Sequence, residues 1–166
     1  MSYFLRVFCQ SSELVPISEI TDFIQDGSYF EEQSRFVVCN VKSDAEETHW
    51  QSLTIHYETG KRPIVIERNI NDELLHQEVK ETIEMLKLCE PSRQQSEIID
   101  QLSATKQVIA IEIDFDGLRD AAWEMLDCLE AHLASILSGI IYAPNDGFYD
   151  RHVQLIYQLR EKQPVS

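Results

Sequence analysis

Apolar and polar residues alternate with a period of two along several segments of the chain, which is the pattern of a half-buried β-strand. In the segment 107–115 the isoleucines fall on one side, and Glu112 and Asp114 fall on the other. Alternation, or a short run rich in β-branched and aromatic residues, also predicts strands over 3–9, 35–41, 50–58, 63–67, 139–143 and 153–159. Pro63 predicts an edge position for its strand, because proline cannot donate a ladder hydrogen bond.

Apolar residues spaced three or four positions apart predict helices in other parts of the chain. The clearest helix covers residues 118–137. An earlier helix opens near Pro16 and ends at Gly27, where a glycine suits the C-terminal cap.

Two further helices are predicted between the strand-rich parts of the sequence. Asn71 or Asp72 caps the first of them. The second runs over residues 93–102, with Ser92 and Gln95 spaced as a capping box. These two helices occupy the middle of the chain.

The predicted elements fall into two stretches with a similar order. Residues 1–70 give a strand, a helix and several strands, and residues 107–166 give a strand, a helix and a strand pair, with the helices of 71–106 between them. We therefore expect one α+β domain over 1–166, with a mixed or antiparallel sheet, helices on one face, and two βαββ-like, ferredoxin-like halves. One ferredoxin-like unit with a C-terminal addition is the alternative.

The charge balance narrows the choice of partner. Among the 166 residues, 29 Asp and Glu stand against 14 Lys and Arg, which gives a formal net charge of −15. Nucleic acids and anionic membrane surfaces need clusters of Lys and Arg, and the sequence has none, so neither is an expected partner. An acidic surface can attract a basic protein, and the simpler alternative is a surface that only keeps the protein in solution.

Several absences in the sequence bear on location and cofactors. The first residues lack the pattern of a signal peptide, and the longest uncharged stretch, 131–145, is too short to span a bilayer. The four cysteines show no zinc-ligand spacing. We expect a cytoplasmic protein and predict no cofactor.

Three acids near the end of one predicted strand are candidate metal ligands. Glu112 and Asp114 share a face of the strand, and Asp116 follows where the strand ends. Oxygen ligands grouped in this way can hold Mg²⁺ or Ca²⁺, although the spacing departs from that of a calcium-binding loop. The alternative is a polar strand face followed by acids near a helix N-terminus.

A predicted loop places two adjacent aromatic residues among acids. Asp146, Phe148, Tyr149 and Asp150 form this group, and aromatic anchors with charged neighbours are typical of protein-binding hot spots. Strict alternation places Trp50 among the polar side chains of its strand, so Trp50 is a further candidate. The alternative is that Phe148 and Tyr149 fold back over one end of the core.

The sequence contains no nucleophile elbow, phosphate-binding loop or dinucleotide motif. It therefore favours a non-enzymatic interaction or regulatory module, comparable in physical terms to small acidic bacterial proteins that neutralise basic toxins or nucleases. A metal-dependent enzyme or metal-binding module built on Glu112, Asp114 and Asp116 is the alternative. Self-association through an edge strand at 63–67 or 153–159 is a third option.

Overall fold

The computed structural model describes residues 2–40, 48–70 and 72–159 of the chain. The alternative helix cap Asn71 and the end of the strand predicted over 35–41 lie outside these ranges. The strands are β1 (Ser2–Cys9), β2 (Arg35–Asn40), β3 (Trp50–His56), β4 (Ile64–Ile70), β5 (Gln107–Asp114), β6 (Gly139–Ala143), β7 (Gly147–Tyr149) and β8 (Leu155–Gln158). The helices are α1 (Ile17–Asp26), α2 (Glu73–Lys87), α3 (Arg93–Ser103) and α4 (Asp120–Leu137).

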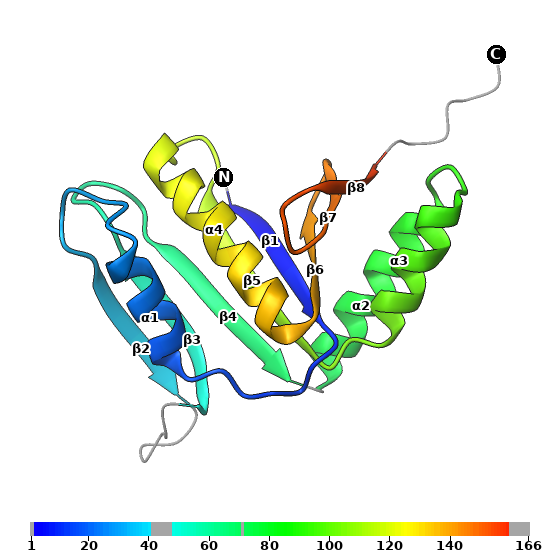
Figure 1. Ribbon diagram of the computed structural model, residues 1–166, viewed down its shortest axis with the longest axis horizontal. Helices are drawn as coiled ribbons and strands as arrows, with labels where there is room; N and C mark the ends of the chain where they lie inside the picture. Colours follow the sequence, from blue (N-terminus) through cyan, green and yellow to red (C-terminus); the bar gives the residue numbers. More distant parts are fainter. Residues whose placement is uncertain (1, 41–47, 71, 160–166) are drawn as a thin grey trace.

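The strands form one antiparallel sheet in the order β2-β3-β4-β5-β1-β6-β7-β8 (Figure 1). The predicted α+β class with an antiparallel sheet is therefore confirmed. Two ferredoxin-like halves are not confirmed. The strands that would begin each half, β1 and β5, pair with each other, and the crossover through α1 passes three strands whereas the crossover through α4 passes one.

The helices cover both faces of the sheet, so the expectation of helices on one face is wrong. Successive side chains of a strand point to opposite faces, and the central strands carry apolar residues in both directions. Val7 of β1 belongs to the core beneath α1 and α4, whereas its neighbour Phe8 belongs to a second core beneath α2 and α3. Figure 1 shows α1 and α4 crossing in front of the sheet, with the α2–α3 pair away from them.

The sheet ends at β2 on one side and at β8 on the other. The predicted edge position of 63–67 is wrong, because β4 pairs with both β3 and β5. Pro63 precedes the strand, so it interrupts no ladder hydrogen bond. The strand predicted over 153–159 is confirmed as β8, and it does lie at an edge.

The two predicted helix N-caps within the described ranges are present. Asp72 and Ser92 each accept a hydrogen bond from the main-chain N–H three residues later, at 2.9 and 3.1 Å. The other half of the predicted capping box, a bond from the Ser92 main-chain N–H to the Gln95 side chain, is wrong. The side chain of Gln95 instead donates to the main-chain oxygen of Leu86. Gln95 therefore closes the end of α2 and not the start of α3.

A buried guanidinium joins three segments of the chain. Arg68 of β4 is 6% exposed, and its terminal nitrogens donate to the main-chain oxygens of Val15 (3.2 Å), Thr48 (2.6 Å) and Trp50 (2.9 Å). The Arg68 Cζ lies 4.3 Å from the centroid of the Trp50 ring. Burial lowers the pKa of Arg68 to about 10, so the group remains charged at neutral pH. Arg68 thus ties the segment before α1 to the start of β3.

The substitution Arg68→Met should lower the free energy of unfolding by about 3 kcal/mol, because it removes three hydrogen bonds to main-chain oxygens, of which that of Val15 keeps another donor, Trp50 Nε1. Urea denaturation measures this loss. Arg93→Met is the matched control, since Arg93 is exposed and pairs with Glu97 one turn along the same helix, and its effect should stay below about 0.5 kcal/mol. Equal stabilities of the two variants would contradict the role of Arg68.

Candidate functional site

A cleft opens at one end of the central strands, where β1 begins, β5 ends and β6 turns into β7. It consists of two adjoining cavities that share Tyr3, Phe115 and Asp146 in their walls. The inner cavity, of about 250 Å³, contains Glu130 of α4, and we call it the Glu130 chamber. The outer cavity has a volume of about 570 Å³. We call the two cavities together the acidic cleft.

Aromatic rings line the acidic cleft. The register of β1 and β5 places Tyr3 opposite Ile113, so Tyr3 meets Phe115 just beyond the end of β5, with the ring centroids 5.0 Å apart. Trp123, near the start of α4, packs edge-on against Phe115 at 5.4 Å. Phe115 remains 49% exposed, so the wall offers aromatic surface to a ligand.

The tyrosine hydroxyls of the cleft already donate hydrogen bonds within the protein. The Tyr3 hydroxyl donates to the Pro144 main-chain oxygen at 2.6 Å, and the Tyr149 hydroxyl donates to Asp146 Oδ2 at 2.6 Å. Burial raises the pKa of Tyr3 to about 12, and the hydrogen bond to Asp146 raises the pKa of Tyr149 to about 12. Both side chains therefore stay neutral, and both hydroxyl donors are occupied.

Glu130 is the buried acid of the cleft. It is 4% exposed and lies among the core residues of α4. In the part of the chain that the structure describes, no hydrogen bond or ion pair reaches its carboxyl group. Burial and, to a lesser extent, the neighbouring Asp127 raise the pKa of Glu130 to about 8. Its carboxyl group therefore holds a proton at neutral pH and has no protein partner.

The chemistry of the cleft suits a cation. Asp116, Asp127 and Asp146 line it together with Glu130, and none of its described lining residues is Lys, Arg or His. Partial burial raises the pKa of Asp127. Carboxylates accept hydrogen bonds, and the faces of aromatic rings attract positive charge. A ligand that carries N–H donors and a positive charge would donate to these carboxylates and would also be attracted by the ring faces.

Two of the predicted partner-binding residues, Asp146 and Tyr149, line the Glu130 chamber. Asp150 does not line it, and its Oδ1 accepts two main-chain N–H bonds of the following turn at 2.8 and 3.0 Å. Phe148 is fully buried and stacks on Tyr142 at 4.7 Å, so its prediction as a surface anchor is wrong. The alternative, a ring that closes one end of the core, describes Phe148 but not Tyr149.

The prediction of Trp50 as a surface anchor is also wrong. Trp50 is 2% exposed, and its Nε1 donates to the main-chain oxygen of Val15 at 2.9 Å. Strict alternation fails because the pairing of β2 and β3 shifts, with Cys39 opposite Ser52 but Asn40 opposite Trp50. This β-bulge turns Trp50 into the core beneath α1 and α4.

The three predicted metal ligands do not come together. Glu112 Oε1 accepts from Arg62 Nη2 at 2.9 Å and from the Ser2 hydroxyl at 2.8 Å, while Asp116 lines the outer cavity. Among the residues of the described ranges, no group of three or more His, Cys, Asp or Glu could hold a metal ion. Glu112, Asp114 and Asp116 therefore do not form a ligand set in this structure.

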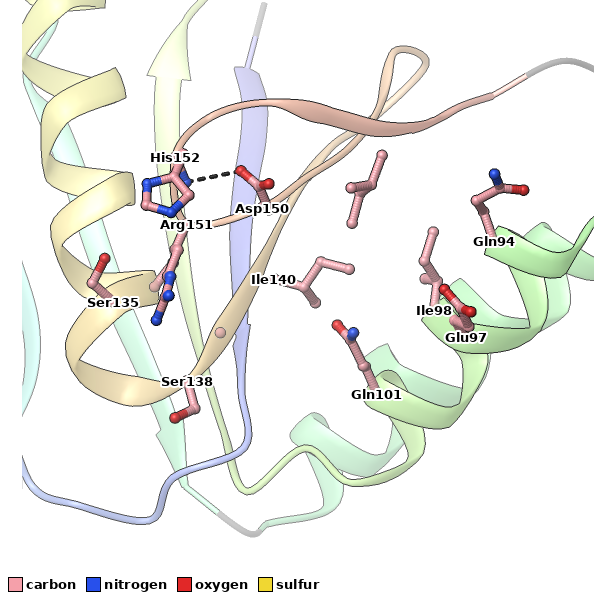
Figure 2. Close-up of a pocket in the computed structure, with 13 residues that line it drawn as sticks. Gln94, Glu97, Ile98, Gln101, Ser135, Ser138, Ile140, Asp150, Arg151 and His152 are labelled. Atoms are coloured by element: carbon pink, nitrogen blue, oxygen red, sulfur yellow. Dashed lines mark hydrogen bonds between the residues drawn. The ribbon is translucent and has the colours of Figure 1, made fainter.

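A separate groove of about 510 Å³ lies between α3 and the turn after β7 (Figure 2). Figure 2 shows Glu97 and Gln101 on the α3 wall, with Arg151 and His152 on the opposite wall. The groove thus mixes both signs of charge. None of the charged side chains in its described lining is buried, whereas Glu130 in the acidic cleft is. It is therefore a weaker candidate than the acidic cleft.

Sequence reasoning misses most of the acidic cleft. One signal for it is present, which is an acid on the apolar face of α4. Glu130 follows Leu126 by four positions and precedes Leu133 by three, so the three side chains share that face. No local signal marks Tyr3 and Phe115, which meet only through the pairing of strands that are far apart in the sequence.

No known protein family, curated protein or solved structure matches the chain. Within the described ranges, none of the helices has the length and apolar character needed to cross a membrane. The function is therefore argued from the chemistry of the site.

Phe148→Ala should lower the free energy of unfolding by about 3–5 kcal/mol, because it leaves a cavity in a closely packed core. Tyr149→Phe removes only the hydroxyl that bonds Asp146, so we expect a loss of about 1 kcal/mol or less. Urea denaturation of both variants makes the comparison. If the Phe148→Ala protein were as stable as the parent, the role of Phe148 as a core side chain would be contradicted.

Raising the pH from about 5 to about 8 should destabilise the protein through Glu130. The folded chain keeps the Glu130 proton up to about pH 8, whereas the unfolded chain loses it near the ordinary pKa of 4.5. The folded state binds more protons in this window, so the free energy of unfolding falls as the pH rises. Glu130→Gln cannot ionise, so its stability relative to the parent should rise by more than about 2 kcal/mol between these pH values.

Glu124→Gln is the matched control for this pH series, since Glu124 is exposed on the same helix. Its stability relative to the parent should not change with pH. The other titratable groups that face Glu130, which are Asp127, Asp146, Tyr3 and Tyr149, are common to all three proteins. A pH-independent difference for Glu130→Gln would contradict the raised pKa.

Proposed function

We propose that the protein is a non-enzymatic interaction module that binds a basic segment of another protein in the acidic cleft. The observation that carries this proposal is the lining of the cleft, where four acids and four aromatic rings stand without a described basic residue. Aromatic side chains anchor many protein interfaces, and carboxylates beside them select cationic partners.

The charge of the whole chain supports the same type of partner. A formal net charge of −15 creates a field that attracts basic proteins and raises their rate of association. The same field opposes contact with nucleic acid and with anionic lipid surfaces. We place this encounter in the cytoplasm, in line with the expectation from the sequence.

The size of the cleft limits what it can bind. Cavities of about 250 and 570 Å³ accommodate a few side chains and not a whole protein domain. A short exposed segment of the partner, with basic side chains that alternate with small residues, fits this space. We expect a dissociation constant in the micromolar range, which corresponds to roughly 8 kcal/mol of binding free energy.

Calorimetric titration with the peptide acetyl-Gly-Lys-Gly-Arg-Gly-Lys-Gly amide tests the proposal. The parent protein should bind this peptide, bind more weakly as salt is added, and not bind a peptide with glutamate at the three basic positions. The double variant Asp116→Asn with Asp146→Asn should weaken binding by about tenfold, or about 1.4 kcal/mol, because it removes two of the acids that line the cleft.

The double variant Glu84→Gln with Asp100→Asn is the matched control. It removes the same charge from exposed positions on α2 and α3, and we expect it to weaken binding by less than about twofold. Equal weakening in both double variants would show that only net charge attracts the peptide, which would contradict the cleft as the site. Failure of the parent protein to bind would contradict the proposed function itself.

A further inference from the structure

Glu130 is an unusual residue for its position. Only 4% of the residue is exposed, and among the described residues nothing donates a hydrogen bond to its carboxyl group. Burial of a carboxyl group without a partner costs free energy, whether or not the group is ionised. Leu126 and Leu133 occupy the neighbouring positions on the same face of α4, where an apolar side chain would pack without this cost. Glu130 lines the chamber, so this unpaired acid is available to a ligand there.

We propose that the Glu130 chamber is a receptor site for one guanidinium group, that of an arginine side chain in the basic partner. The inference rests on the proposed function and names the chemical group that the acidic cleft recognises. Asp127 and Asp146, which also line the chamber, would face the remaining N–H groups of the same guanidinium.

The lining of the chamber favours a cationic donor over other ligands. The hydroxyls of Tyr3 and Tyr149 already donate to Pro144 and Asp146, so beyond the one proton of Glu130, which a cation can displace, the chamber offers mainly acceptors. A sugar or a neutral amide would need donors as well as acceptors. A metal ion would need several converging ligands, and the described residues contain no such group.

Among cations, the walls favour guanidinium over ammonium. The ring cluster of Tyr3, Phe115 and Trp123, together with apolar residues such as Leu5 and Ile141, forms a weakly hydrated wall. A guanidinium group is planar and weakly hydrated, stacks on aromatic rings, and donates two parallel N–H bonds to one carboxylate. An ammonium group is compact and strongly hydrated, so it loses more on entering such a chamber.

Binding in this chamber is coupled to a proton. The groups that face Glu130 are Asp127 of the same helix, Asp146 after β6, Tyr3 of β1 and Tyr149 of β7, and none of them supplies positive charge. The free carboxyl group is therefore protonated at neutral pH. When the guanidinium enters, the carboxyl group becomes a carboxylate, its O–H bond breaks, and the proton passes to the solvent.

Calorimetry of the full chain with three peptides tests this inference. The first is the peptide with arginine at its centre, and in the other two citrulline or lysine replaces that arginine. Titration at about pH 7 in phosphate and in Tris, which differ in ionisation enthalpy, should report release of about one proton for the arginine peptide. The citrulline peptide, in which a neutral urea group replaces the guanidinium, should bind about tenfold more weakly and release no proton.

Variants identify the group that releases the proton. Glu130→Gln should bind the arginine peptide about tenfold more weakly and without proton release, whereas Glu124→Gln should behave as the parent does. The lysine peptide should bind the parent about fivefold more weakly than the arginine peptide. Proton release by the parent is measured without any substitution, so the test stands even if Glu130→Gln folds poorly.

The outcomes separate this inference from the proposed function. If the parent binds the arginine peptide without proton release, or binds the citrulline or lysine peptide equally well, the guanidinium site is wrong while the acidic cleft can still bind basic segments. If Glu130→Gln releases the same proton, Glu130 is not the group. If no basic peptide binds the parent, both the inference and the proposed function fail.

Discussion

The pairing of β1 with β5 is the constraint on which the rest of the structure depends. It joins Ser2 to Asp114 and Cys9 to Gln107, so the chain must close the long loop of residues 10–106 to form it. Both strands bury side chains on both faces, and neither the core beneath α1 and α4 nor the core beneath α2 and α3 exists without them. The cost of loop closure is therefore offset by two hydrophobic cores at once.

The same pairing builds the candidate site. It brings Tyr3, at the start of β1, against Phe115, just beyond the end of β5, and these two residues line both cavities of the acidic cleft. After β5 the chain crosses over β1 as helix α4 and re-enters the sheet as β6. This crossover places Glu130 of α4 over the paired strands. The burial of Glu130 follows from this crossover. Its free-energy cost falls at the proposed binding site, where proteins commonly keep groups that lower stability.

Local patterns predicted the elements well but not how they assemble. The alternation in β5, the apolar stripe of α4 and the caps Asp72 and Ser92 follow from short-range rules, and the structure contains each of them. The two layers of helices could not be predicted. Local periodicity determines neither which strands a crossover passes nor which face of the sheet its helix covers. Trp50 was misplaced for a similar reason, since a β-bulge reverses the alternation on which its placement depended. Of the candidate site, the sequence singled out only Asp116, Asp146 and Tyr149, because the cleft joins positions from both ends of the chain.

The most direct test of a cation-binding cleft is to locate a bound basic peptide on the protein by NMR. Intermolecular nuclear Overhauser effects should connect the side chain of a ¹³C-labelled central arginine to the rings of Tyr3, Phe115 and Trp123, with amide shifts that change most around Glu130 and Asp146. Contacts with Gln101 and Arg151 in the groove of Figure 2, or shift changes scattered over the acidic surface, would contradict the account.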